Sequence, residues 1–195
     1  PLAVSEGAAG LTDDVAELSG AGPLIVTTDA LVEGVHFLPS DPIESVARKL
    51  VRANVSDILA KGARPREALL TLAWPKDRDE AELARFARAL GEDLAVWGAQ
   101  LIGGDTTSSP AGLFLSLTLT GICGPRGPVR RSGARAGDAL WVTGEIGAAC
   151  LGFHAIQSGR RQDQTVTDYR SPRVQPVTIA GLIHDHATAS MDVSD

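Results

Sequence analysis

Aromatic side chains, basic residues and long apolar runs are all scarce in this chain of 195 residues. Because aromatics make up only 4% of the sequence, we expect a core built mainly from aliphatic side chains. No apolar run approaches the roughly 18 residues that a membrane-spanning helix needs, and no basic leader precedes an apolar stretch, so we expect no membrane contact. The 18 Lys and Arg are outnumbered by 24 Asp and Glu, and the resulting net charge of −6 argues against a nucleic-acid-binding surface.

Cysteine is rare and the common nucleotide-binding motifs are missing. The two cysteines, Cys123 and Cys150, lack metal-binding spacing, so we expect two buried thiols in a protein of the reducing cytoplasm. No Gly is followed by Lys, which excludes a P-loop, and neither GxSxG nor HExxH occurs. Any phosphate-binding site must therefore use other residues.

Alternating strand and helix patterns run through the sequence and indicate an α/β fold. Hydrophobic residues make up 44% of the chain and charged residues 22%, as in globular domains. We expect strands at residues 23–28, 67–74, 100–102, 113–123 and 138–143. We expect helices from 41 to about 62, where Asp41, Pro42 and Glu44 form a capping box, and at 79–97, 145–158 and 177–189.

The best candidate for a linker is the segment 125–137, in which Gly, Pro and Arg gather. We therefore expect one domain over residues 1–130 and the beginning of a second α/β unit over residues 131–195. The chain starts with Pro1 rather than Met and ends at Asp195, directly after a strand-like segment. We expect it to be a fragment whose second domain is truncated.

Aspartates recur where apolar segments meet loops. Asp14, Asp29, Asp105 and Asp192 each stand beside a short apolar run, and for any one of them alone a turn or a helix cap is the simpler explanation. Taken as a set, they suggest instead that several carboxylates converge on one point.

Asp57 adds to this set because it lies on the first predicted helix. At 100° per residue it falls about 20° from Leu50, and Asn54 falls about 40° from Leu50, so both polar side chains occupy the buried stripe. Two carboxylates about 4 Å apart repel by about 4 kcal/mol at an effective dielectric constant of about 20, so converging carboxylates require divalent cations between them. Hard oxygen ligands with few His or Cys nearby favour magnesium, which commonly shares its ligand positions with nucleotide phosphates.

Two further features have more than one interpretation. His36, in the tetrapeptide GVHF, is either a core or turn histidine or a site residue. Arg130 and Arg131, in the candidate linker, are either solvated charges or a phosphate clamp. Spacing alone does not choose between these interpretations.

Six segments in order resemble the thiamine-monophosphate kinase family, within the superfamily of aminoimidazole ribonucleotide synthetase, selenophosphate synthetase and HypE. They are TDDVAEL (12–18), TTDALVEGVHF (27–37), ANVSDILAKGA (53–63), LIGGDTT (101–107), RSGARAGDALWVTG (131–144) and MDVSD (191–195). The resemblance implies a PurM-like N-terminal α/β domain with a mixed sheet and flanking helices, followed by the start of a truncated second α/β domain. It also implies a homodimer in which the sheets of two subunits pair, and transfer of the ATP γ-phosphoryl group to thiamine monophosphate.

The resemblance also implies roles for individual residues. The implied magnesium ligands are Asp14, Thr27, Thr28, Asp29, Asp57, Asp105, Asp192 and Asp195. The implied ATP contacts are Gly104, Asp105, Arg131 and Ser194, and His36 matches a position that touches thiamine monophosphate. No residue is expected to form a covalent intermediate.

The chain departs from the family pattern at Thr12, where the family usually has Gly before the paired aspartates. The family also continues beyond MDVSD with a long region that supplies further substrate contacts. Two alternatives therefore stay open: another ATP-using enzyme of the same superfamily, or a dimerising module that binds metal and nucleotide without catalysis.

Overall fold

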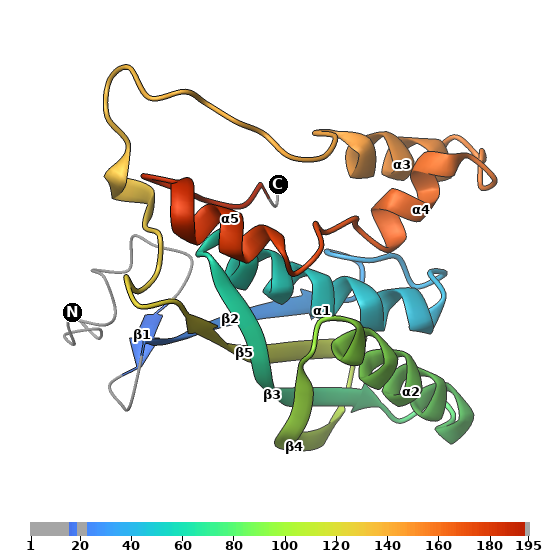
Figure 1. Ribbon diagram of the computed structural model, residues 1–195. Coiled ribbons are helices and arrows are strands. Elements are labelled where there is room, and N and C mark those ends of the chain that lie inside the picture. Colours follow the sequence, from blue (N-terminus) through green and yellow to red (C-terminus); the bar gives the residue numbers. More distant parts are fainter. Residues whose placement is uncertain (1–15, 19–22, 194–195) are drawn as a thin grey trace.

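In the described part of the chain, residues 16–18 and 23–193, strands and helices are interspersed up to Cys123, and only helices follow (Figure 1). The structure is a computed structural model. Its strands are β1 (Ala16–Leu18), β2 (Leu24–Val32), β3 (Ala63–Pro75), β4 (Gln100–Ser109) and β5 (Phe114–Cys123). Its helices are α1 (Ile43–Ala60), α2 (Glu80–Val96), α3 (Ala148–Gln157), α4 (Gln164–Arg170) and α5 (Ile179–His186), with a short 3-10 helix, η2 (Arg131–Gly133).

The strands form one mixed sheet in the order β1-β2-β5-β3-β4. β3 and β4 run parallel, and the other neighbouring strands run antiparallel. On β5, Leu115, Leu117 and Leu119 are buried, whereas Ser116 and Thr118 lie between them on the opposite face. The alternation predicted for residues 113–123 is therefore confirmed, and it gives the sheet one covered face and one open face.

Helix α1 covers the sheet and forms the centre of the core. It contacts β2, β3 and β5, and α2 packs beside it (Figure 1). Its side chains Leu50, Val51, Val55 and Ile58 are fully buried, and each contributes about 1.5–3 kcal/mol of transfer free energy. Helix α5 lies over α1, and its Ala180 belongs to the same core. The last helix therefore packs on the N-terminal sheet domain.

The start of α1 differs from the prediction. The helix begins at Ile43 with Pro42 at the N-cap and no side-chain cap, so the capping box on Asp41 and Glu44 is wrong. The carboxylate of Asp41 instead accepts a hydrogen bond from the Leu38 backbone N–H and pairs with Arg170. The predicted helix at 79–97 is confirmed. Helix α2 covers Glu80–Val96, and the side chain of Asp79 caps its N-terminus.

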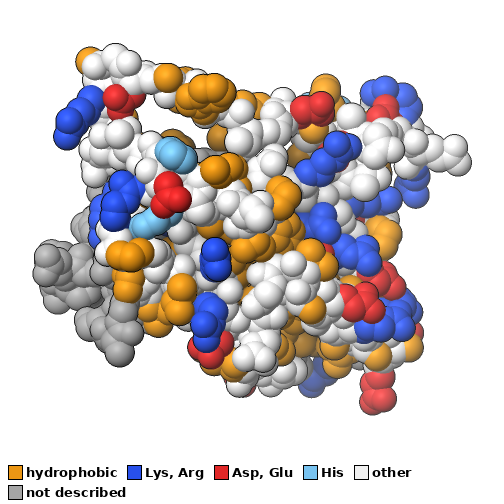
Figure 2. All heavy atoms as spheres, in the orientation of Figure 1, with side chains coloured by type: hydrophobic (Ala, Val, Ile, Leu, Met, Phe, Trp, Pro, Cys, Tyr) orange, Lys and Arg blue, Asp and Glu red, His pale blue; other side chains and the backbone are white. Residues whose placement is uncertain are grey.

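The strand predicted at 138–143 is wrong. This segment has no regular secondary structure, and Leu140 and Trp141 in it are 97% and 86% exposed. A strand without a neighbour leaves its backbone N–H and C=O groups unpaired, and the described sheet contains no strand that pairs with residues 138–143. Figure 2 shows hydrophobic side chains at the surface along the segment that joins η2 to α3.

Other differences from the predictions are smaller. β2 continues to Val32 and β4 to Ser109, so Asp29 and Asp105 lie within strands and not at their ends. Cys123 is buried as predicted, but Cys150 is exposed on the outer side of α3. Within the described residues, none of the helices is both long enough and apolar enough to cross a membrane.

Candidate functional site

Two polar contacts join α1 to β2 beneath the covered face of the sheet. Thr27 Oγ1 donates to Asp57 Oδ2 at 2.5 Å, and the backbone N–H of Asp29 donates to Asn54 Oδ1 at 3.2 Å. Thr27 and Asp29 are two residues apart on a strand, and Asn54 and Asp57 are three apart on a helix, so each pair shares one face of its element. The predicted placement of Asn54 and Asp57 on the buried stripe is correct, since Asn54 is 0% exposed and Asp57 is half-buried.

The carboxyl group of Asp57 lies in an electrostatically unfavourable position. Its pKa is raised to about 7, mainly by burial and also by the negative charges of Asp192 and Asp29. The hydrogen bond from Thr27 and the positive charge of Lys61 oppose this shift. Asp29, Asp57 and Asp192 are thus brought together from three distant parts of the sequence, and a cation beside them would be stabilised.

Lys61 binds the C-terminal segment around Ser190 and holds it near Asp57, a role that the sequence did not predict. Its side chain is fully buried, and Nζ donates to the carbonyl oxygen of Ser190 at 2.9 Å. The carbonyl oxygen of Lys61 accepts from the backbone N–H of Val129 at 3.0 Å, and Ser190 N–H donates to Arg130 O at 3.3 Å. These contacts bring residues 129–131 and 190–192 to the C-terminal end of α1, close to Asp57.

The residue after Thr27 faces the other way. Thr28 Oγ1 accepts from Thr118 Oγ1 at 3.1 Å and donates to the carbonyl oxygen of Leu117 at 3.2 Å, and Thr28 is exposed. Within one chain, Thr28 therefore lies on the open face, away from Asp57.

Asp105 is also distant from the cluster. It pairs with Thr71 across β3 and β4, and Thr71 in turn pairs with Ser116 on the open face of the sheet. β4 is three strands from β2, about 14 Å at about 4.8 Å per strand. A single chain therefore does not bring Asp105 to Asp29 and Asp57.

Gly104, next to Asp105, has a structural reason to be glycine. A Cβ atom built on it would lie 1.9 Å from the carbonyl oxygen of Leu70 on β3. The close approach of β4 to β3 at this point thus excludes any side chain.

The other predicted site residues lie in three places. His36 is exposed in the turn after β2, where its Nδ1 accepts a hydrogen bond from the Val32 N–H at 3.0 Å. Arg131 is exposed at the start of η2, next to Arg130. Asp14, Ser194 and Asp195 lie outside the described residues.

The donor set fits magnesium in kind. Thr27 Oγ1 bonds to Asp57, and Asp29 and Asp192 lie near enough to Asp57 to raise its pKa; magnesium prefers such carboxylate and hydroxyl oxygens. Within the described residues, no group of three or more His, Cys, Asp or Glu side chains is arranged to hold a metal ion. Further ligands would have to come from phosphates, water or the residues outside that range.

Comparisons with known proteins agree on one family. The model of the family described as AIR synthase related protein, N-terminal domain, matches residues 11–123. The curated thiamine-monophosphate kinase of Caulobacter vibrioides is 42% identical over 190 residues, which are 95% of this chain and 53% of that protein. The crystal structure of thiamine monophosphate kinase from Aquifex aeolicus has a TM-score of 0.82 at 31% identity, over 88% of this chain and 59% of that one.

A further structure, described as AaThiL complexed with AMPPCP and TMP, has a TM-score of 0.87 at 31% identity, over 94% of this chain and 60% of that one. This chain therefore spans little more than half the length of the relatives that it matches. The match over residues 11–123 nevertheless includes the whole five-stranded sheet with α1 and α2. The chain belongs to the family of AIR synthase related proteins, with its sheet domain as the matching part.

Proposed function

We propose that this chain serves the ATP-dependent phosphorylation of thiamine monophosphate to thiamine diphosphate. The observation that carries the proposal is the convergence of Asp29, Asp57 and Asp192 beside the bond between Thr27 and Asp57. Carboxylates that destabilise one another are suited to a magnesium–nucleotide complex. The likeness to a structure that holds AMPPCP and TMP supports the choice of substrates.

In this proposal, Asp57, Asp29, Thr27 and Asp192 hold magnesium together with Asp14 and Asp195. When bound, magnesium supplies positive charge that lets two anionic phosphates approach each other. Arg131 and Ser194 contact the nucleotide, and His36 contacts thiamine monophosphate. Asp57 must be ionised to serve as a ligand, so its raised pKa makes metal binding sensitive to pH near neutrality.

The transfer itself needs no base from the protein. A phosphate monoester has a second pKa near about 6, so the acceptor phosphate is largely dianionic at neutral pH. Its oxygen forms a bond to the γ-phosphorus of ATP while the bond to the β-phosphate oxygen breaks, and ADP leaves. The protein's residues position the two substrates in line, and no phosphorylated side chain forms.

A homodimer is part of the proposal, because the open face of the sheet carries apolar side chains. Val32, Leu69, Phe114 and Ile122 are each more than one-third exposed. A second copy that covers them would remove apolar surface from water. In such a dimer, Asp105, Gly104 and Thr28 would face the second copy. They would then form a site with residues of that copy, although they lie far from Asp57 of their own chain.

We further propose that residues 1–130 form the ATP- and magnesium-binding domain and that residues 131–195 begin a second domain. The family match to residues 11–123 supports the first part of this division. The exposed thiol of Cys150 supports a reducing, cytoplasmic location.

A coupled assay of ADP release with magnesium, with and without thiamine monophosphate, tests the proposal. We expect release that depends on thiamine monophosphate and falls at least about tenfold in Asp29→Asn, because an amide is a poorer magnesium ligand than a carboxylate. Asp77→Asn, an exposed aspartate in the turn before α2, is the matched control and should match the parent. ADP release independent of thiamine monophosphate would favour another enzyme of the superfamily, and nucleotide binding without turnover would favour a binding module.

A further inference from the structure

The turn that carries His36 is closed by its own hydrogen bonds. Gly34 N–H donates to Phe37 O at 2.8 Å, and His36 N–H donates to Val32 O at 2.9 Å. The Val32 N–H donates to His36 Nδ1, so the neutral imidazole carries its proton on Nε2. The side chain of Phe37 is buried in the main core and anchors the end of the turn.

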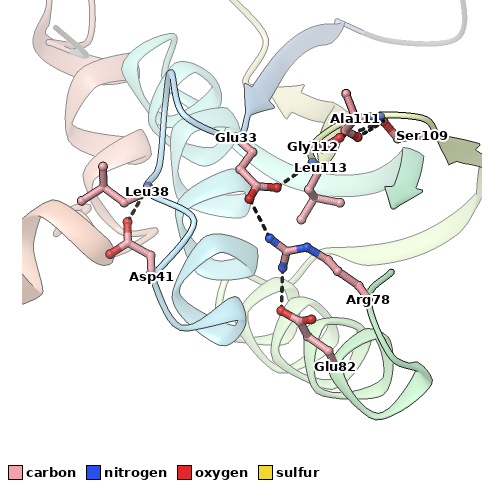
Figure 3. A network of polar contacts seen from close by, with 9 residues as sticks. All are labelled: Glu33, Leu38, Asp41, Arg78, Glu82, Ser109, Ala111, Gly112 and Leu113. Carbon is pink, nitrogen blue, oxygen red and sulfur yellow. Dashed lines mark hydrogen bonds and ion pairs between the residues drawn. The ribbon is translucent and has the colours of Figure 1, made fainter. Parts of the chain in front are cut away.

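The start of this turn is fixed to the sheet and to α2, as Figure 3 shows. Glu33 Oε2 accepts from the backbone N–H of Leu113 at 2.7 Å, and Glu33 Oε1 pairs with Arg78 at 3.0 Å. Arg78 also pairs with Glu82 on α2 at 2.6 Å. These contacts of the start of the turn all come from elements of the N-terminal domain.

The middle of the turn depends on α1 and α4. Lys49 Nζ donates to the carbonyl oxygen of His36 at 2.7 Å. The same ammonium group lies 4.1 Å from the centroid of the Tyr169 ring, within range of a cation–π interaction. Lys49 thus joins the backbone of His36 to an aromatic side chain that is 120 residues further along the chain than Lys49.

The end of the turn depends on α4 as well. Asp41 Oδ2 accepts from the backbone N–H of Leu38 at 2.9 Å, as Figure 3 shows, and Asp41 Oδ1 accepts from Arg170 Nε at 2.9 Å. The Asp41 side chain is only 2% exposed, and the Tyr169 hydroxyl also hydrogen-bonds to it. The side chain of Leu38 packs against the small apolar cluster of α3 and α4 that contains Tyr169.

We propose that Lys49, Asp41, Tyr169 and Arg170 are positioning residues that set the orientation of the His36 turn for the phosphorylated substrate. This inference rests on the proposed function, in which His36 contacts thiamine monophosphate. Helix α4, which lies beyond the family match at residues 11–123, then positions the substrate end of a site whose metal ligands Thr27, Asp29 and Asp57 belong to the sheet domain. Removal of the Lys49 ammonium group leaves the His36 carbonyl oxygen without this donor and loosens the turn.

Four variants test this proposal. Lys49→Met keeps the aliphatic stem and removes the donor, and Lys49→Arg restores a positive donor. Tyr169→Phe keeps the ring under Nζ and removes only the hydroxyl that bonds to Asp41. Lys76→Met, at an exposed lysine in the turn before α2, is the matched control.

Two measurements are made on each variant. The first is amide hydrogen exchange over residues 33–38, which needs no ligand and therefore tests the positioning contacts apart from the proposed function. The second is calorimetric titration with thiamine monophosphate and, separately, with magnesium–ATP. Far-ultraviolet circular dichroism confirms that each variant is folded.

We expect Lys49→Met to exchange faster over residues 33–38 and to bind thiamine monophosphate about tenfold more weakly, with ATP affinity unchanged. Lys49→Arg should recover most of both properties, Tyr169→Phe should lie between them, and Lys76→Met should match the parent. Unchanged exchange in both Lys49→Met and Tyr169→Phe would overturn the proposal, as would equal losses for both ligands. Faster exchange with unchanged thiamine monophosphate affinity would also overturn it.

A parent protein that does not bind thiamine monophosphate would refute the proposed function and the substrate role of the turn. Exchange would then still decide whether α4 holds the turn: faster exchange in Tyr169→Phe would support that contact, and unchanged exchange in this variant would refute it.

Discussion

Thr27 and Asp57 are 30 residues apart in the sequence, yet their side-chain oxygens lie 2.5 Å apart. The hydroxyl of Thr27 is the donor, so it partly stabilises a carboxylate that burial and two neighbouring carboxylates destabilise. The Asp57 carboxylate is therefore in an unfavourable environment when it is ionised, as expected of a group that binds a cation.

The raised pKa of Asp57 predicts that stability depends on pH. Because this pKa is about 7 in the folded protein and 3.8 in its ordinary state, the folded chain binds a proton between these values that the unfolded chain does not. The contribution of Asp57 to stability is therefore complete below about pH 4 and is lost as the pH rises through 7. Asn resembles the protonated form, so Asp57→Asn should be more stable than the parent at pH 8 and close to it near pH 4 in chelator-containing buffer.

Urea denaturation at the two pH values checks this prediction. A stability difference between Asp57→Asn and the parent that does not change with pH would contradict it. Addition of magnesium at pH 8 should stabilise the parent and leave Asp57→Asn almost unchanged.

A methyl group at Gly104 should destabilise the edge of the sheet. Its Cβ would lie 1.9 Å from the Leu70 carbonyl oxygen, so β4 must move away from β3. We expect Gly104→Ala to cost about 1–3 kcal/mol, the range of overpacked cores. Gly91→Ala is the control, since nothing lies within 4 Å of its Cβ on α2, and it should stabilise the protein by roughly 0.5–1 kcal/mol. Thermal unfolding of both variants measures this contrast, and a Gly104→Ala protein as stable as the parent would contradict it.

The ion pair between Arg52 and Asp93 should be worth more than a surface ion pair. Arg52 binds both oxygens of Asp93, at 3.2 and 2.9 Å, and also donates to the carbonyl oxygens of Ser171 and Pro172. Asp93 is almost fully buried, so Arg52→Met leaves a buried charge without this partner and should cost about 3 kcal/mol or more.

The control for this pair is Arg85→Met, which breaks the more exposed pair with Glu44 and should cost less than about 1 kcal/mol. Denaturant unfolding of the two variants compares them. Equal losses would show that burial of Asp93 makes no difference.

A charged side chain on the open face of the sheet should weaken the proposed dimer. Leu69 is 47% exposed on β3, so Leu69→Lys should remain folded and should place a charge within the proposed interface. We expect the mass measured by light scattering to fall from that of a dimer toward that of a monomer. Val96→Lys changes an exposed apolar residue at the end of α2, away from the sheet face, and should leave the mass unchanged. A dimer that survives Leu69→Lys would place the interface elsewhere.

Local patterns in the sequence predicted the elements whose burial is periodic. The alternation at 113–123 and the apolar stripes of α1 and α2 are all present, because each records a buried face directly. The segment 138–143 has a similar apolar content and forms no strand, since a strand also needs a partner to pair with. The sequence pattern contains no information about that partner.

The candidate site was predictable only where the helix repeat placed a polar residue on a buried face. Asn54 and Asp57 were predicted in this way. Asp29 and Asp192 were predicted only as part of a group of aspartates that stand beside apolar runs. The register of the sheet then separated Asp105 from them, because strand order is not encoded in local spacing. Lys61 and Lys49 gave no local signal, and the local pattern at Asp41 suggested a helix cap instead. Each of the three acts through a partner more than ten residues away in the sequence.

The packing of α5 on the sheet domain bears on how this chain folds. Ala180, with Val177 and Ile179, buries apolar surface that belongs to the same cluster as Leu50 and Leu117. A protein cut at residue 123, where the family match ends, would present that surface to water. We therefore expect a protein that ends after α5 to be more stable than one that ends at residue 123, because the contacts that complete its apolar core lie beyond the family match.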